Sequence, residues 1–256
     1  MKTTYKQDYW KKRFVFYHFI NLTPFQIESL HLAHLKAGNR GITFLDLGCG
    51  DGRYLFAYYS EERLHPQDTT IALDVSYDAL VTTKQAVHKT IPVQGDALQL
   101  PFKKNAFDLV QCSMLIEHVS DVMLLREIKY ILPPGAVLYL ITVIRRPYAP
   151  FRTRSPEGRL VLVMNHLREY KNTQEIIDLV TNNGFTSYGF RSYVLKISPV
   201  RRLIMQGLKW RLIDLPIEKR TFVIDPKMKK IIKLLSFPIP IIGYYVFEGI
   251  FIADGE

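Results

Sequence analysis

Cysteine is scarce in this chain, since its 256 residues include only Cys49 and Cys112. Two distant cysteines exclude a disulfide framework, and they lack the close spacing of a cysteine zinc site. A secretory leader is not expected either, because residues 1–13 are polar and charged. The most apolar stretch, residues 234–252, contains two prolines, two glycines and a glutamate. These breaks argue against a membrane-spanning helix. Together the absences predict a protein of the reducing cytoplasm.

Acidic residues are the second deficit. The chain has 24 Asp and Glu against 34 Lys and Arg, for a net charge of +10. Residues 191–233 hold twelve of the basic residues and three of the acidic ones. This one block therefore carries most of the excess charge, whereas a nucleic-acid-binding fold more often spreads it over its surface. No known nucleic-acid-binding module is recognisable either, so the sequence argues against a nucleic-acid partner.

The same basic block has apolar residues at helical spacing. Such basic amphipathic helices can lie on an anionic membrane surface, which would make the protein peripheral at a membrane. They can also form a cap whose apolar face covers an active site. From the sequence, the basic block can be either a membrane-surface element or an active-site cap.

Short apolar runs alternate with helical patterns through most of the chain. Strands alternating with helices predict βαβ units and a mostly parallel, buried sheet, which defines an α/β fold. Helix starts are predicted at the capping residues Thr23, Ser76, Ser120 and Asn172. The predicted helices are 24–38, 53–60, 77–88, 121–131 and one that ends near 184; the predicted strands are 42–47, 70–74, 91–93, 107–113, 136–144, 185–197 and 244–253.

A glycine-rich turn follows the first of these strands. Gly48, Gly50 and Gly52 come directly after an apolar run that contains Asp46. Glycine there permits left-handed backbone angles and lets a ligand lie against the main chain. The spacing G-x-G-x-G differs from the dinucleotide pattern G-x-G-x-x-G. A carboxylate such as Asp46 would repel a pyrophosphate but receive an ammonium group. The turn therefore favours a ligand with an amino-acid tail over NAD.

Two more aspartates stand where later strands should end. Asp74 closes the second strand, where an acid can accept hydrogen bonds from a ribose diol. Asp96 follows the third, where it can accept from an adenine amino group while Ala97 donates its backbone N–H. Each aspartate alone is as well explained as a turn residue. Their recurrence at successive strand ends favours one shared site.

These motifs together resemble a class I S-adenosylmethionine-dependent methyltransferase, in the branch that includes ubiquinone and menaquinone biosynthesis enzymes. The matching segments are LDLGCGDG (45–52), ALDVS (72–76), GDALQLPF (95–102), FDLVQCSMLIEHV (107–119) and ILPPGAVLYL (131–140). The resemblance implies a Rossmann-like, mostly parallel seven-stranded sheet with helices on both faces and an antiparallel last strand. It also implies S-adenosylmethionine as the cofactor.

The resemblance assigns donor-binding residues by position. It implies that Asp46 and the glycine turn face the methionine part, Asp74 the ribose, and Asp96 with Ala97 the adenine. The full predicted donor site is Asp46, Gly48, Cys49, Gly50, Gly52, Asp74, Val75, Asp96, Ala97, Ser113 and Met114.

The expected organisation is one methyltransferase domain over residues 1–256. It comprises an N-terminal helical segment (1–40), the donor-binding core (41–195), a basic amphipathic insertion (196–240) and the final strand (241–256).

Residues for the acceptor side are predicted from their place after the fourth and fifth strands. His118 is the candidate general base, with a packing role as the alternative. Arg145 and Arg146 could bind a carboxylate or phosphate, or simply lie in a solvated loop. His166 is a further candidate for substrate contact. The remaining histidines have no shared spacing with acids, so no metal centre is predicted.

The sequence thus predicts methyl transfer to a small-molecule or lipid-linked, anionic acceptor. One alternative is a non-enzymatic membrane-surface or scaffold protein that retains the fold. Another is a nicotinamide-dependent oxidoreductase, against which the early third glycine and Asp46 count. No pattern in the sequence indicates an oligomeric state.

Overall fold

The computed structural model describes most of the chain outside the basic segment. The described residues are 21–38, 40–150, 153–155, 158–161, 165–197 and 238–255. The predicted amphipathic insertion over 196–240 therefore falls almost wholly outside the described residues.

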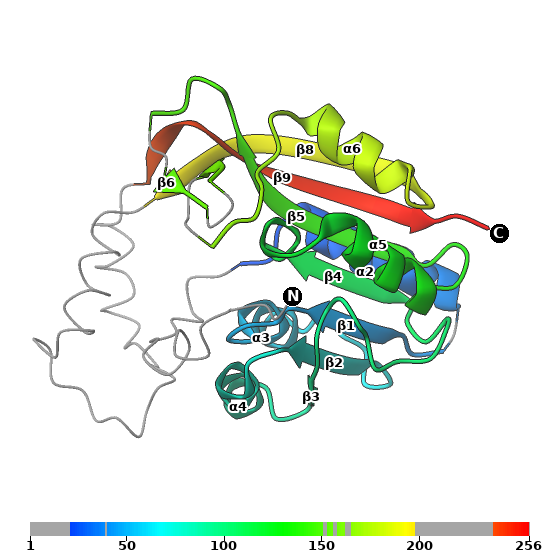
Figure 1. Ribbon diagram of the computed structural model, residues 1–256. Helices are drawn as coiled ribbons and strands as arrows, with labels where there is room; N and C mark the ends of the chain where they lie inside the picture. The colour runs from blue at the N-terminus through cyan, green and yellow to red at the C-terminus, as the bar shows by residue number, and fades with distance from the viewer. Residues whose placement is uncertain are drawn as a thin grey trace, which may run out of the picture.

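A seven-stranded sheet forms the centre of the molecule, in the order β3-β2-β1-β4-β5-β9-β8 (Figure 1). Its first five strands pair in parallel, and β9 pairs antiparallel with both β5 and β8. This arrangement confirms the predicted α/β fold and its antiparallel last strand. The strands are β1 Thr43–Leu47, β2 Thr69–Asp74, β3 Ile91–Gln94, β4 Leu109–Ser113, β5 Val137–Arg145, β8 Phe185–Ile197 and β9 Ile239–Ala253.

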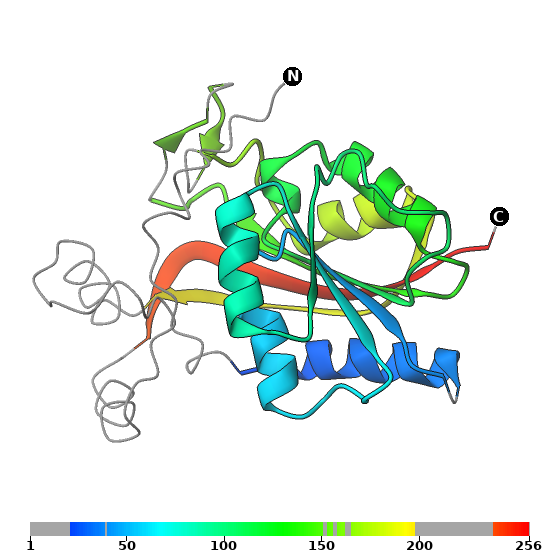
Figure 2. The same ribbon diagram turned by 90° about the horizontal axis from the view of Figure 1, so that it is seen from below.

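Helices cover both faces of this sheet, as Figure 2 shows. Buried side chains of α5 and α6 join one apolar core with inward residues of the strands. Those of α2, α3 and α4 join a second core on the opposite face. The helices are α2 Pro24–Ala37, α3 Arg53–Ser60, α4 Tyr77–Ala86, α5 Asp121–Ile131 and α6 Thr173–Thr181, with a 3-10 turn η2 at Ile116–His118; a two-stranded ribbon pairs β6 Thr153–Arg154 with β7 Leu160–Val161.

Three of the four predicted helix caps form as expected. Thr23 makes a complete capping box with Gln26, and Ser76 and Asn172 accept backbone N–H groups of α4 and α6. Ser120 stands at the start of α5, but its side chain makes no capping hydrogen bond. The prediction of a cap by Ser120 is therefore wrong, although the helix starts at the predicted residue.

The last strand is longer than the sequence pattern indicates. It begins at Ile239, because Ile239 and Pro240 pair with Ile197 and Lys196 at the far end of β8. Among the described residues, no helix is long and apolar enough to cross a membrane.

Candidate functional site

A cavity of about 300 Å³ opens at the carboxyl ends of β1 to β4. Parallel strands bring their carboxyl ends to one edge of a sheet, and open α/β sheets bind ligands there. The cavity is lined by Gly48, Cys49, Gly50, Asp51, Arg53, Tyr54, Leu73, Asp74, Val75, Gly95, Asp96, Ala97, Ser113, Met114, Leu115, His118 and Val119. Most of the predicted donor-binding residues thus meet at one place.

The glycine turn between β1 and α3 forms one wall of this cavity. Gly48, Gly50 and Gly52 have φ angles of 72°, 55° and 72°, all in the left-handed region that favours glycine. A Cβ atom at Gly52 would lie 2.7 Å from Cγ2 of Thr83. At Gly52, a residue with a side chain would need an unfavourable positive φ and would also clash with Thr83 of α4, so glycine is required there. Gly52 itself stands behind the wall and does not line the cavity.

Asp74 ties this turn to the end of β2. Its Oδ2 accepts the backbone N–H of Gly50 at 2.9 Å, and its Oδ1 accepts that of Ser76 at 2.9 Å. Burial raises the pKa of the Asp74 carboxyl, while these backbone hydrogen bonds oppose the shift. Asp74 therefore shapes the turn and also presents its carboxylate to the cavity.

Asp96 and Ala97 form the wall beyond β3. Asp96 is exposed, and its Oδ1 accepts the backbone N–H of Leu98 at 2.9 Å. Ala97 is buried beside it. Both line the cavity on the side away from β4, where the resemblance implies an adenine.

Asp46, like Gly52, is a predicted donor residue that does not line the cavity. It is 1% exposed. Gln111 donates to its Oδ1 at 3.2 Å, while its Oδ2 is buried without a hydrogen-bond partner among the described residues. Burial, helped by the charges of Asp51 and Asp74, raises the pKa of Asp46 to about 7, against the hydrogen bond from Gln111. Asp46 is thus a buried acid beneath the turn, satisfied on one oxygen only.

The end of β4 shows two signs of a functional site. The hydroxyl of Ser113 is buried, with no hydrogen-bond partner in the described part of the chain. Met114, the next residue, has a φ of 52°, which is unusual for a side chain of its size. Both residues line the cavity, so an unsatisfied polar group and a strained backbone meet where a ligand would lie.

His118 lines the cavity at the end of η2. Its Nδ1 lies 3.1 Å from the carbonyl oxygen of Asn165 and donates to it. Burial, together with the nearby His166, lowers the pKa of His118 to about 4. A histidine with this pKa is neutral near pH 7 but accepts a proton weakly. The structure therefore gives little support to a general-base role.

The three predicted substrate residues lie outside the cavity lining. Nε of Arg145 stands 3.3 Å from Oε2 of Glu169, and Nδ1 of His166 lies 2.7 Å from the other oxygen of that carboxylate. Arg146 stacks on Tyr245 with its guanidinium 5.5 Å from the ring centre. Arg145 and His166 thus both contact Glu169. The sequence could not reveal the contact of Arg145, because no local pattern links that residue to Glu169.

Some cavity residues were missed by the sequence reasoning. Asp51 is buried within the glycine turn, and Nε of Arg53 donates to its Oδ1 at 2.7 Å. Tyr54, Leu115 and Val119 add apolar surface to the cavity. All of these residues lie inside or next to the quoted motifs, and that position is the sequence signal that could have identified them.

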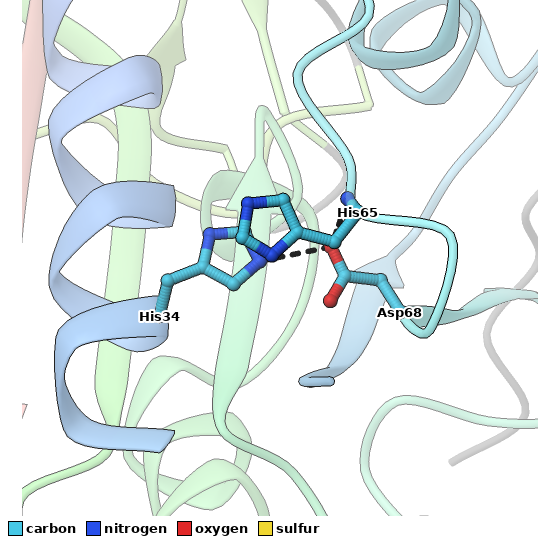
Figure 3. A group of neighbouring side chains, drawn as sticks. All are labelled: His34, His65 and Asp68. Atoms are coloured by element: carbon cyan, nitrogen blue, oxygen red, sulfur yellow. Dashed lines mark hydrogen bonds and ion pairs between the residues drawn. The ribbon is translucent and has the colours of Figure 1, made fainter. Parts of the chain in front are cut away.

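Two groups of possible metal ligands also escaped the sequence analysis. Each brings together residues from separate segments, so no local spacing announces it. One consists of Glu117, His118 and His166, beside the cavity. The other consists of His34, His65 and Asp68, near the amino end of β2 (Figure 3).

Comparison with known proteins identifies the class of domain. Residues 45–140 match the family described as "Methyltransferase domain", which confirms the resemblance found in the sequence motifs. A demethylmenaquinone methyltransferase of Lactococcus lactis is 35% identical over 101 residues, which are 37% of this chain and 39% of that protein. The human mitochondrial arginine-hydroxylase NDUFAF5 is 37% identical over 94 residues, which are 36% of this chain and 26% of that protein. The chain thus matches less than half the length of these relatives.

Solved structures share the fold over most of the chain. A SAM-dependent methyltransferase from Methanosarcina mazei has a TM-score of 0.56 and 16% identity, covering 93% of this chain and 100% of that one. Phosphoethanolamine N-methyltransferase 2 of Haemonchus contortus, solved with S-adenosylhomocysteine, has a TM-score of 0.54 and 17% identity, covering 89% and 52%. At this level of identity the likeness establishes the Rossmann-like fold.

Proposed function

We propose that this protein binds S-adenosylmethionine in the cavity and transfers its methyl group to a small-molecule acceptor that carries a negative charge. The observation that carries the proposal is the cavity itself. It joins the glycine turn, Asp74, Asp96 and the end of β4 at the carboxyl edge of the sheet. The methyltransferase-domain match over residues 45–140 supports the same conclusion.

The residues present fit this cofactor. A ligand with a hydroxyl-bearing ribose suits the Asp74 carboxylate, and one with an amino group suits exposed Asp96. The hydroxyl of Ser113 and Oδ2 of Asp46, both without a partner among the described residues, are two more polar groups near the turn. An ammonium group bound above Asp46 would offset its buried charge. S-adenosylmethionine supplies an activated methyl group on a sulfonium, together with each of these polar features.

The protein's part in such a reaction is chiefly positioning. Methyl transfer needs the acceptor atom held in line with the breaking bond, and correct placement supplies much of the acceleration. Met114, Leu115 and Val119 add apolar side chains to the cavity wall, and such surface excludes water around a bound donor. Arg146, partly exposed just after β5, is available to attract an anionic acceptor.

Donor binding is tested by calorimetric titration with S-adenosylhomocysteine, with NAD as the comparison ligand. We expect binding of the first and none of the second. Asp96→Ala and Asp74→Asn should each weaken binding at least tenfold, since each removes an acceptor from the cavity wall. Asp178→Ala is the matched control, because this aspartate of α6 does not line the cavity. Unchanged affinity in both cavity variants would contradict the proposed site.

Turnover is tested by incubating the protein and labelled donor with lipid and quinol extracts. Mass spectrometry should find an acceptor heavier by one CH₂ group. An acceptor heavier by one oxygen atom would instead indicate hydroxylation, the activity for which the human relative is named. Donor binding without any modified acceptor would support a non-enzymatic role for the fold.

A further inference from the structure

The cluster of Glu117, His118 and His166 has no role in the proposed donor site beyond the place of His118 on the cavity wall. One potential ligand atom from each of the three residues lies within 4.8 Å of the others. Glu117 and His166 are buried, and His118 is partly buried. We propose that these three side chains bind a divalent transition-metal ion at the edge of the cavity.

The orientation of the two imidazoles supports this site. The rings of His118 and His166 stand almost perpendicular, at 81°, with their centres 4.7 Å apart. Imidazole binds a metal through a nitrogen lone pair in the ring plane, and two perpendicular planes intersect along a line that one ion can occupy. Two imidazoles and one carboxylate form a donor set that suits Zn²⁺ and related ions and leaves further positions open.

The hydrogen bonds around the cluster determine which nitrogen of each imidazole carries its proton. Nδ1 of His118 donates to the carbonyl of Asn165, at 3.1 Å, and Nδ1 of His166 donates to Glu169, at 2.7 Å. In a neutral imidazole the other nitrogen, Nε2, then carries the lone pair. Metal-binding histidines usually donate their second nitrogen to a carboxylate or a backbone carbonyl in this way. Both histidines therefore have the outer hydrogen bonds of metal ligands.

The backbone holds the cluster together before any ion binds. The carbonyl oxygen of Glu117 accepts the N–H of Leu167 at 2.8 Å, so η2 is joined to the segment that carries His166. The hydroxyl of Thr142 on β5 donates to Oε2 of Glu117 at 3.0 Å. The ligand atoms thus belong to elements that are already fixed relative to one another.

The charges near the cluster also favour a cation. Glu117 and Glu169 place two carboxylates in the interior, and Arg145 lies beside the second. A buried carboxylate needs a nearby cation or several hydrogen bonds. A divalent ion at Glu117 would supply that charge. The competing explanation is that His166 only pairs with Glu169 while Glu117 keeps its hydrogen bond from Thr142, which predicts no metal binding.

The group of His34, His65 and Asp68 is less suited to an ion (Figure 3). Its two rings are stacked nearly parallel, at 17° with centres 4.1 Å apart, so no nearby point lies in both ring planes. The carboxylate of Asp68 already accepts hydrogen bonds from His34 and from the backbone of His65 and Ile42. This group therefore serves as the control for adventitious binding.

The test is a calorimetric titration of chelator-treated protein with ZnCl₂ in the absence of any donor, so its outcome is independent of the proposed methyl transfer. We expect one equivalent of Zn²⁺ to bind. His118→Ala should weaken binding at least tenfold, and the double variant His34→Ala/His65→Ala should bind as the parent does. Glu169→Ala should weaken binding by roughly 10- to 100-fold, as loss of an outer hydrogen-bond partner does.

Binding of Co²⁺, followed by its visible absorption, gives a second readout that reports ligands directly. We expect the Co²⁺ spectrum to change in His118→Ala and to persist in the His34→Ala/His65→Ala variant. Should burial make His166→Ala unfold, His118→Ala at the cavity wall still decides the matter. The proposal is overturned if the parent binds no Zn²⁺, or if removing His34 and His65 abolishes binding while His118→Ala leaves it intact.

Discussion

The aspartates around the donor cavity differ in how each carboxylate is satisfied. Asp74 holds two backbone N–H groups, and Asp96 is exposed. Asp46 has a donor in Gln111, which is itself held by Gln26 through a 3.0 Å hydrogen bond. Oδ2 of Asp46 has no partner within the described ranges, so a cation bound nearby would stabilise its charged form.

Donor binding should therefore depend on pH through Asp46. Its pKa is raised to about 7, so the carboxyl is largely neutral below that pH and charged above it. A ligand with an ammonium group binds the charged form. We expect the affinity for S-adenosylhomocysteine to rise between about pH 5.5 and 7.5, by about tenfold for each unit below the pKa. Calorimetry across this range measures the dependence.

Asp46→Asn provides the control for that titration. It cannot ionise, so its affinity should be low and flat across the same range. An equally steep pH dependence in Asp46→Asn would assign the titration to a different group.

The glycine turn allows a direct test of local strain. Gly52 and Gly158 both have positive φ, 72° and 79°. A methyl group added at Gly52 would meet Thr83, whereas one added at Gly158 would have no described atom within 4 Å. Gly158→Ala should destabilise the protein by ~1–2 kcal/mol through backbone strain alone. Gly52→Ala should cost roughly 1–3 kcal/mol more, because its methyl also crowds Thr83. Denaturant unfolding compares the two, and equal losses would contradict the packing argument.

Single residues were predictable from sequence where the motif is local. The glycine turn, Asp74 and Asp96 stand within a few residues of their strand ends, so the pattern placed them at the cavity. The pairing of Arg145 with Glu169 could not be predicted, because Glu169 comes from the separate segment before α6. The substrate role of Arg145 and His166 stays a prediction. The donor-binding role stays a prediction for all of these residues, including Asp46, which lies beneath the cavity wall.

Helices and strands are predicted well because their patterns extend over many residues. The bounds of α3, α5 and β8 agree with the sequence interpretation to the residue. Most other differences lie at the ends of elements, where tertiary hydrogen bonds decide. Phe107, for example, is predicted to begin a strand, but its N–H bonds to the carbonyl of Ile131, so β4 begins at Leu109.

Replacing the capping residue by alanine should lower the free energy of unfolding at one helix start more than at another, because the two caps differ in their hydrogen bonds. Thr23 accepts the N–H of Gln26 at 3.2 Å, and the Gln26 side chain accepts the N–H of Thr23 at 3.0 Å. Thr23→Ala should lower the free energy of unfolding by about 0.5–2 kcal/mol. Ser120→Ala should change it by less, because the Ser120 side chain makes no cap bond. Thermal or denaturant unfolding of both variants measures the contrast, and equal losses would count against it.

At the scale of the whole molecule, the ends of β8 and β9 extend beyond the sheet beside the β5–β6 connection (Figure 1). This extension carries Ile239 and Ile242, which are 50% and 67% exposed, and Tyr148, which is 63% exposed, belongs to the adjoining connection. The basic segment 198–237 joins the two strands in sequence. Exposed apolar side chains on strands that a basic segment joins in sequence suit an anionic membrane surface.

We therefore predict that the full chain cosediments with vesicles that contain anionic lipid, and less with purely zwitterionic vesicles. Ile242→Glu should reduce the bound fraction severalfold, because it adds a negative charge to the exposed extension. Leu35→Glu is the matched control, since Leu35 is 64% exposed on α2. Equal loss in both variants, or equal binding to both kinds of vesicle, would contradict a membrane-facing extension.

The position of β9 has a consequence for how the protein is made. Segment 239–253 is wedged between β5 and β8, although both of those strands precede it in the sequence. While the ribosome is still adding that segment, β5 and β8 each present an open row of backbone N–H and carbonyl groups. Once the segment is in place, the Glu248 carboxylate accepts hydrogen bonds from Tyr139 of β5 and Arg191 of β8. We therefore expect incompletely folded chains to be prone to edge-to-edge association until segment 239–253 pairs with both strands.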